Sequence, residues 1–282
     1  EIWFCTNLIR FKVMMFFQSP DKMFTLHEGD CLQILPTLTQ NTVNMVFADP
    51  PYFLSNDGLT VKNGTIQSVN KGEWDKFSDD NAVYVFTYEW LSQVRELLAE
   101  DGTIWISGTH HNIFMIGRIL SLLNYKILNM ITWEKPNPPP NFSCRYFTYS
   151  TEWVIWARKN KNNPHYFNYD LMKTINGGKQ LKDVWKLPSV CSWEKSEGKH
   201  PTQKPLSLLS RIILASTKEN DLVLDPFSGS STTGIASSLL TRNFIGIEQE
   251  ECFLNLSKNR YLSLTEEKRQ NLKKIIYTQI SI

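Results

Sequence analysis

Short apolar runs alternate with helical patterns along most of this sequence, and this alternation limits the possible folds more than any other feature. Five runs have the length and composition of buried strands: residues 43–48, 103–106, 153–157, 222–224 and 243–247. Apolar side chains recur at helical spacing over residues 86–98, which we expect to stop at Asp101-Gly102, and over residues 205–217 and 232–240. Strands that alternate with helices of this length are typical of a parallel sheet. The sequence therefore predicts an α/β fold with a doubly wound, mostly parallel sheet.

Three segments interrupt the alternation. Residues 55–75 are rich in Ser, Asn, Gly and Lys and predict a loop, whereas residues 136–145 begin with a proline-rich run that cannot be helical. From residue 159 to 200 strand-like runs and helical patterns no longer alternate. Between Lys135 and Lys204 there are 12 Lys or Arg against 5 Asp or Glu, although the whole chain carries a net charge of only +2. This local excess fits a surface that binds a polyanion, or else an ordinary solvated lysine-rich face.

The cysteines and the first residues bear on the cellular compartment of the protein. The five cysteines are scattered and form no C-x-x-C pair, so we expect a reducing compartment, the cytoplasm, and no metal site. Within residues 1–22, the run from Ile2 to Phe17 is apolar but includes Arg10 and Lys12, so neither a signal peptide nor a membrane span is expected. We interpret residues 1–22 as a peripheral extension, with a natural start at Met14, Met15 or Met23.

The first motif that carries chemistry is Asp49-Pro50-Pro51-Tyr52, which directly follows the predicted strand 43–48. Loops after the strands of a doubly wound sheet are where such folds bind ligands. The prolines stiffen this loop, Asp49 and nearby carbonyl groups supply acceptors, and Tyr52 supplies a ring that can stack on a planar base. These groups suit an exocyclic amine that attacks an electrophilic methyl group, because the acceptors stabilise positive charge on the nitrogen. Taken alone, the motif also fits an ordinary proline-rich turn.

The second motif, residues 223–234, runs from a strand through a turn of small residues into a helix. It matches neither G-x-G-x-x-G nor G-x-x-x-x-G-K-[ST], so a nucleotide phosphate is not implied. Glu248 ends the next strand about 20 residues further on, which is the placement of a carboxylate that binds ribose hydroxyls. A turn of small residues and a carboxylate placed to bind ribose, without a phosphate-binding loop, suit an adenosine that carries an amino-acid tail.

The third motif, residues 200–205 (His-Pro-Thr-Gln-Lys-Pro), opens the helix that precedes this strand. Thr202 and Lys204 could hold a carboxylate such as the amino-acid end of that ligand. Proline at a helix start is common, so this motif is weak alone. The order of the three motifs is the informative feature.

In this order, the motifs resemble those of the amino-methyltransferases of bacterial restriction–modification systems, in the permuted arrangement called the beta class, over residues 23–262. Within that class, four stretches are similar to the adenine methyltransferases that modify GATC and accept single-stranded DNA: residues 47–55, 71–76, 141–148 and 198–205. The resemblance implies a circularly permuted, Rossmann-like methyltransferase fold. It also implies transfer of a methyl group from S-adenosylmethionine to N6 of adenine in a specific DNA site.

The resemblance orders the parts of the chain. We expect a catalytic half at residues 23–158, a target-recognition insertion at residues 159–200, a cofactor-binding half at residues 201–262 and a helical extension at residues 263–282. The catalytic loop comprises Asp49, Pro50, Pro51 and Tyr52. The residues expected to bind S-adenosylmethionine are Asp30, Thr202, Lys204, Asp225, Pro226, Phe227, Gly229, Ser230, Thr232 and Glu248.

One residue departs from the family pattern. The turn normally reads Gly-Ser-Gly-Thr-Thr, and Ser231 replaces the second glycine. If this position requires a positive φ, serine costs about 1–2 kcal/mol, which we expect to weaken cofactor binding about tenfold. In ordinary backbone space the change is harmless.

DNA, single- or double-stranded, is the expected partner, with the target base flipped out or already unpaired. Trp74 is expected to stack on or clamp the strand and Arg145 to read a guanine edge. Lysines of the basic segment are expected to bind phosphates, among them Lys179, Lys182 and Lys186. Most aromatic side chains near the pocket and the insertion, a set that includes Tyr146, Tyr149, Trp185 and Trp193, are expected to be core, as are Trp153 and Trp156 in the strand 153–157. A homodimer and a cognate restriction endonuclease are expected as partners, and a membrane is not.

Four alternatives stay open. The chain could methylate the cytosine amine or RNA, although the Asp-Pro-Pro-Tyr form favours adenine over cytosine. It could methylate a glutamine side chain, but those enzymes usually begin the tetrad with Asn. It could be a DNA-binding homologue whose cofactor turn has decayed, with Ser231 as the indication. The E-x-K spacing of Glu197-Gly198-Lys199 also occurs in metal-dependent nucleases, but no strand precedes it.

Overall fold

The computed structural model describes residues 14–51, 80–138, 140–141 and 144–281, together with the backbone of residues 59–62 and 65–68. Within this part of the chain, nine strands form one sheet in the order β1-β2-β11-β10-β3-β6-β8-β7-β9. These strands are β1 (Met14–Gln18), β2 (Phe24–Glu28), β3 (Val43–Ala48), β6 (Leu98–Gly108), β7 (Lys126–Glu134), β8 (Thr151–Arg158), β9 (Val184–Lys186), β10 (Leu222–Asp225) and β11 (Asn243–Glu248). The strands of the C-terminal part, β10 and β11, thus lie between β2 and β3 of the N-terminal part.

The sheet is mostly parallel. The pairs β2–β11, β11–β10, β10–β3, β3–β6 and β7–β9 are parallel, and the pairs β1–β2, β6–β8 and β8–β7 are antiparallel. The parallel core β2–β11–β10–β3–β6 brings five strand ends to one edge of the sheet. The loops that follow these strands, which carry the first two motifs, therefore meet there.

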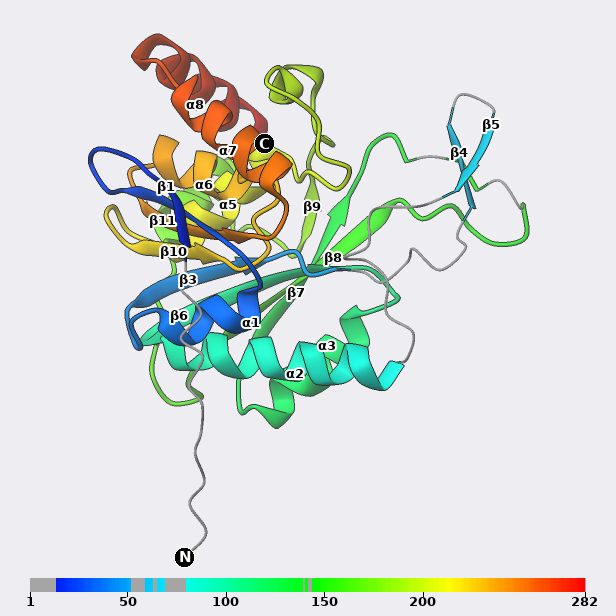
Figure 1. The fold of residues 1–282 in the computed structure, drawn as a ribbon. Coiled ribbons are helices and arrows are strands. Elements are labelled where there is room, and N and C mark those ends of the chain that lie inside the picture. Colours follow the sequence, from blue (N-terminus) through cyan, green and yellow to red (C-terminus); the bar gives the residue numbers. More distant parts are fainter. Residues whose placement is uncertain are drawn as a thin grey trace, which may run out of the picture.

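Helices cover both faces of the sheet (Figure 1). One face carries α1 (Cys31–Ile34), α2 (Asp80–Leu97) and α3 (Ile113–Leu122), and the other carries α5 (Leu206–Ser216), α6 (Thr232–Leu239), α7 (Glu251–Leu262) and α8 (Glu266–Ile280). Alternate residues of each strand enter opposite cores: on β3, Met45 and Phe47 face the α5–α8 side, whereas Val46 and Ala48 face the α1–α3 side. This alternation explains why β3 is apolar throughout.

The five predicted strands and three predicted helices are present, and two local predictions were wrong. The helix expected at residues 86–98 begins earlier, at Asp80, and ends at Leu97 rather than at Asp101-Gly102. The carbonyls of Glu96 and Leu97, at the end of the helix, accept the N–H groups of Asn41 and Thr42. Strand β6 then begins at the next residue, Leu98. Residues 55–75, predicted to be a loop, contain the antiparallel strands β4 (Leu59–Lys62) and β5 (Thr65–Ser68). β-branched residues around Asn63-Gly64 are the sequence signal for such a pair.

The segments at the margins pack onto the same framework. β1 lies within residues 1–22 and adds an edge strand to β2. In residues 159–200, α4 (Tyr169–Ile175) contributes Met172 to the α5–α8 core, and β9 and the residue after it contribute Trp185 and Leu187. Trp193, in the 3₁₀ turn Ser192–Lys195, is partly buried against the same core. Among the described residues, no helix is long and apolar enough to cross a membrane.

Candidate active site

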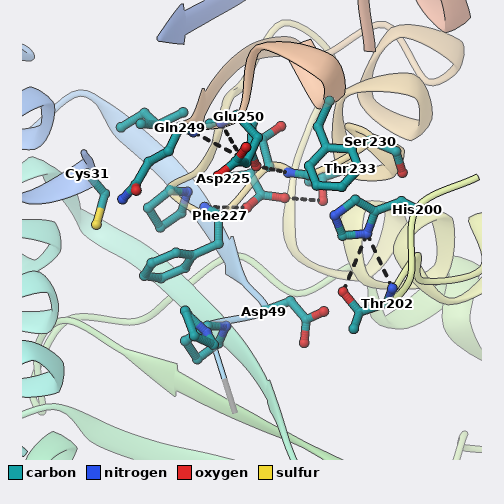
Figure 2. A pocket seen from close by; sticks show the side chains of 18 of the residues that line it. Cys31, Asp49, His200, Thr202, Asp225, Phe227, Ser230, Thr233, Gln249 and Glu250 are labelled. Carbon is teal, nitrogen blue, oxygen red and sulfur yellow. Dashed lines mark hydrogen bonds between the residues drawn. The ribbon is translucent and has the colours of Figure 1, made fainter. Parts of the chain in front are cut away.

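A pocket of about 410 Å³ opens at the sheet edge where β3, β10 and β11 end. Its lining comes from the loops after these strands, from the residues after β2, and from residues 200–204. The pocket brings together the predicted residues Asp30, Asp49, Pro50, Pro51, Thr202, Lys204, Asp225, Pro226, Phe227, Gly229, Ser230, Thr232 and Glu248. Figure 2 shows Cys31 and Gln249 at one side of this pocket and His200 and Thr202 at the other. Tyr52 lies outside the described residues.

Asp225 organises the turn that follows β10. One carboxylate oxygen accepts the N–H of Phe227 at 3.0 Å, and the other accepts the hydroxyl of Thr233 at 2.6 Å. The side chain is buried, and burial raises the pKa of Asp225 to about 7, against the lowering effect of these two hydrogen bonds. Asp225 therefore ties the start of the turn to the first turn of α6 (Figure 2).

Glu248, at the end of β11, is held by backbone N–H groups. Its carboxylate accepts hydrogen bonds from Gly229 at 2.8 Å and from Gln249 and Glu250 at 2.9 Å each. Burial raises the pKa of Glu248, and these hydrogen bonds oppose the shift. Gly229 has a φ of +51°, and a Cβ there would lie 3.0 Å from the His200 ring, so a larger residue is disfavoured on both counts. The carboxylate and the turn are thus fixed relative to each other.

Ser231 has a left-handed backbone, with φ +53° and ψ +41°. The side chain is fully buried, and its hydroxyl lies 2.7 Å from the hydroxyl of Ser228. The position therefore requires the positive φ that favours glycine, which is the first of the two cases that the sequence left open.

Helix α7 holds the turn from behind through residues that the sequence did not reveal. Arg260 is buried and donates to the carbonyl and hydroxyl of Ser230 at 2.5 and 3.0 Å and to the hydroxyl of Thr232 at 3.1 Å. Ser257 donates to the carbonyl of Gly229 at 2.9 Å. Burial lowers the pKa of Arg260 to about 10, so the guanidinium stays charged at neutral pH. The turn is therefore preorganised by side chains outside the pocket.

His200 closes the side of the pocket opposite Gln249 and was not among the predicted site residues. Its ring packs edge-on against Phe253 with centroids 4.2 Å apart, and its Nδ1 accepts the N–H of Thr202 at 3.3 Å. Burial lowers the pKa of His200 to about 4, so the ring is neutral at pH 7. Buried Glu194 anchors the same segment by accepting the N–H of Leu206, the first residue of α5, at 2.7 Å.

Lys204 links the third motif to the first. Its ammonium donates to Oδ2 of Asp49 at 2.5 Å and lies 3.8 Å from Oε2 of Glu152. Glu152 also pairs with Lys135. The four side chains form an alternating row of charges that is largely shielded from solvent, with exposed fractions of 13% for Asp49 and 8% for Lys204. The sequence assigned Lys204 to a ligand carboxylate, whereas the structure places its ammonium on Asp49.

The pocket is acidic. Its lining includes five carboxylates, Asp30, Asp49, Asp225, Glu248 and Glu250, and one ammonium, that of Lys204. This balance suits a ligand with positive charge and disfavours a polyphosphate. Among the described residues, no group of three or more His, Cys, Asp or Glu side chains is arranged to hold a metal ion.

The described residues among those expected to contact DNA lie outside the pocket. Arg145 is exposed on the connection between β7 and β8, Lys179 and Lys182 are exposed between α4 and β9, and Lys186 is exposed on β9, 3.5 Å from Glu134. Trp74 lies outside the described residues. The expectation that most nearby aromatic residues are core holds for Trp185 and Trp156 but is wrong for Tyr146 and Tyr149, which are 61% and 54% exposed.

Comparisons with known proteins cover nearly the whole chain. A family model described as DNA methylase (N6_N4_Mtase) matches residues 43–259. The chain is 63% identical over 270 residues to Type II methyltransferase M2.MboI of Moraxella bovis, covering 96% of this chain and 99% of that protein. It is 51% identical over 245 residues to Type II methyltransferase M2.DpnII of Streptococcus pneumoniae, covering 86% and 91%. The solved structure of an M1.HpyAVI-SAM complex is similar, with a TM-score of 0.63 and 29% identity, covering 86% of this chain and 100% of that one.

Proposed function

Because this chain belongs to the DNA methylase family, we propose that it transfers a methyl group from S-adenosylmethionine to the exocyclic amine N6 of adenine in DNA. The family match confirms the resemblance that the three motifs indicated and the Rossmann-like fold that it implied. We further propose that the target is GATC and that the enzyme acts in a restriction–modification system, alongside an endonuclease for the same site. This proposal places the enzyme in the cytoplasm, beside its DNA, with a homodimer as its assembly.

The observation that carries the proposal is the shared pocket of Asp49 and Glu248. Asp49 directly follows β3 and Glu248 ends β11, these two strands flank β10, and both carboxylates line one cavity. An acidic cavity with a fixed carboxylate at one strand end fits S-adenosylmethionine, which has a sulfonium charge, ribose hydroxyls and no phosphate. Its volume of about 410 Å³ falls within the range of small-molecule sites.

We assign the cofactor contacts to the rigid part of the pocket. Glu248 would bind the ribose hydroxyls, and its three backbone N–H partners hold it in one orientation for that purpose. Asp30 would contact the adenine, while Phe227, whose ring packs against Trp90 at 5.3 Å, would cover it. Asp225 keeps the turn in shape, because both of its oxygens already bind protein groups.

The catalytic chemistry falls to the loop that follows β3. When bound, the cofactor supplies a methyl group attached to a positively charged sulfur. Asp49 and the carbonyl of Pro50 would accept the N–H groups of the target amine, which turns the nitrogen lone pair toward that methyl group. As the N–C bond forms and the bond from that carbon to sulfur breaks, the sulfur would leave as a neutral thioether. The carboxylate of Asp49 would stabilise the positive charge on nitrogen, which would then lose a proton to water. Tyr52 would stack on the flipped base.

Lys204 serves, in this proposal, to orient Asp49 rather than to bind the cofactor's carboxylate. Its ammonium fixes one oxygen of Asp49, and Glu152 and Lys135 on the far side fix the ammonium. Lys204→Met should therefore lower kcat by about 10- to 100-fold, because a misplaced acceptor costs rate. Calorimetry should give a Kd for S-adenosylmethionine within about threefold of wild type. A large loss of cofactor affinity at unchanged kcat would show instead that Lys204 binds the carboxylate of the cofactor.

The reaction is tested with tritiated S-adenosylmethionine and oligonucleotides, single- and double-stranded, that contain or lack GATC. The test compares wild type with Asp49→Ala and with Asp101→Ala, a control at an exposed aspartate on β6. We expect label on adenine that requires both GATC and Asp49 and is unaffected at Asp101. Label on cytosine or on RNA would replace the proposed substrate, and label on adenine outside GATC would replace the proposed site. A folded wild-type protein that labels no nucleic acid would refute the proposal in favour of a decayed DNA-binding homologue.

A further inference from the structure

The connection between β7 and β8 begins and ends beside the catalytic carboxylate. Register pairs Trp133 with Glu152 and Glu134 with Thr151, and the N–H of Lys135 binds the carbonyl of Ser150 at 2.8 Å. Lys135 and Glu152, at the two ends of this connection, belong to the charged row that reaches Asp49 through Lys204. The connection therefore extends outward from the mouth of the site, on the side away from α8 (Figure 1).

The far end of this connection is folded onto itself. The backbone N–H of Asn141 donates to the hydroxyl of Thr148 at 3.3 Å, and the side-chain amide of Asn141 donates to the carbonyl of Tyr146. Cys144 has a positive φ of 52°, which a residue with a Cβ adopts at a cost. These features hold residues 144–149 in a defined shape.

Aromatic rings project from this shape into solvent. Phe147 is 96% exposed, Tyr146 61% and Tyr149 54%. The ring of Tyr149 is stacked on that of His110, with centroids 4.5 Å apart and planes within 6°, and the Tyr146 ring follows at 5.9 Å. His110 comes directly after β6, the neighbour of β3, so this cluster lies at the same sheet edge as Asp49. Single exposed apolar side chains are common, but a cluster of four exposed or stacked rings marks a binding surface.

The charge of the connection identifies the class of partner. Residues 136–150 contain one charged side chain, that of Arg145, because Lys135 at the start of the connection is already paired with Glu152. Exposed rings beside cationic side chains are the combination that binds unpaired nucleic-acid strands, since each base stacks on a ring and phosphates pair with the cations. A protein partner would be expected to cover the rings with apolar surface, and the exposed Arg145 in their midst disfavours that occupant.

We propose that an aromatic platform stacks on unpaired DNA bases that flank the target adenine; it comprises His110, Tyr146, Phe147 and Tyr149. Arg145 pairs with a phosphate of the same strand. This inference rests on the proposed function, because it names where the DNA of that reaction lies. The platform contributes binding and positioning of the strand, while Asp49 contributes the chemistry.

The test measures binding by fluorescence anisotropy with a fluorescein-labelled single strand that contains GATC, and with the matching duplex, in the presence of S-adenosylhomocysteine. The variants are Phe147→Ala and Tyr149→Ala, with Tyr149→Phe to restore a ring. Tyr277→Ala is the matched control, because Tyr277 is 41% exposed on α8, far from the platform. We expect each alanine to raise the Kd for the single strand about tenfold, and Tyr149→Phe and Tyr277→Ala to stay within about twofold.

Three results would overturn the platform. Alanine variants that bind the single strand like wild type would exclude stacking. An equal loss for Tyr149→Phe and Tyr149→Ala would assign the effect to the hydroxyl, and an equal loss on single strand and duplex would assign it to backbone contacts. In each case wild type still methylates DNA, so the proposed function survives. A wild type that binds and labels no DNA would instead end the proposed function.

Discussion

Ser231 allows a test of how this cofactor turn balances backbone strain against a hydrogen bond. A residue with a Cβ costs about 1–2 kcal/mol in the left-handed conformation that Ser231 adopts, with φ at +53°. Its hydroxyl lies 2.7 Å from that of Ser228, and such a bond contributes about 0.5–1.5 kcal/mol. Ser231→Ala removes only the bond, so we expect a loss of about 1 kcal/mol in the free energy of unfolding.

Ser231→Gly removes the bond and the strain together. Glycine also gains about 0.4–1 kcal/mol of freedom in the unfolded chain, which offsets part of the strain relief. We therefore expect the glycine variant to lie within about 1 kcal/mol of wild type and to exceed the alanine variant by about 1 kcal/mol. Urea unfolding followed by circular dichroism measures both differences, provided that the m-values match.

The control is Ser237, which is buried in α6 and donates to the carbonyl of Thr233 at 2.8 Å. At this helical position the order should reverse, with alanine about 1 kcal/mol more stable than glycine. An alanine at position 231 that is as stable as glycine would refute the left-handed backbone in solution. Because the strain exists in the structure without a ligand, we expect the Kd for S-adenosylmethionine of Ser231→Gly to stay within about threefold of wild type, rather than the tenfold change that the sequence suggested.

Two further predictions concern pH and packing. The pKa of His200 is lowered to about 4, below its ordinary value, so His200 contributes stability that is present above about pH 6.5 and is lost as the pH falls toward 4; in urea unfolding, wild type should therefore gain stability relative to His200→Gln as the pH rises from 4 to 6.5, and a difference between the two proteins that does not change with pH would contradict the buried neutral ring. A Cβ on Gly234 would lie 2.5 Å from the Phe244 ring, so Gly234→Ala should destabilise by about 1–3 kcal/mol despite the better helix propensity of alanine. Gly117→Ala in α3, where the nearest atom is 3.8 Å away, should stabilise by about 0.5–1 kcal/mol, and thermal shifts of the same sign for both variants would refute this reasoning.

The framework and most of the pocket could be predicted because their signals are local. Each of the strands β3, β10 and β11 is a short apolar run, and the side chains that line the pocket follow directly after these runs. In a parallel sheet such positions meet at one edge without any further information. The strand pattern therefore places Asp49, Asp225 and Glu248 at one edge of the sheet, and the strand order β11-β10-β3 brings them into one pocket.

The parts that support the pocket could not be predicted, since they depend on long-range pairs. Arg260 lies in a helix with a mixed polar sequence, and nothing near it in the chain indicates that it binds the turn at Ser230. Lys204 reaches Asp49 only because α5 and β3 lie side by side in the fold, and its position in a motif suggested a different partner. The rings of Tyr146, Phe147 and Tyr149 are of the residue types that usually lie in a core, but they are exposed because the connection that carries them extends away from the sheet.

The strand order has a consequence for how the molecule is made. β2 and β3 are synthesised before β10 and β11, but β10 and β11 fill the positions between them in the sheet, so these positions stay empty until residues 222–248 have left the ribosome. Until then, both early strands present unpaired backbone groups to other chains, a condition that invites aggregation. A ribosome that stalls before residue 243 would release a polypeptide with the Asp49 loop but without Glu248. Because synthesis proceeds from the N-terminus, the pocket that methylation requires is incomplete until β10 and β11 have been inserted into the sheet.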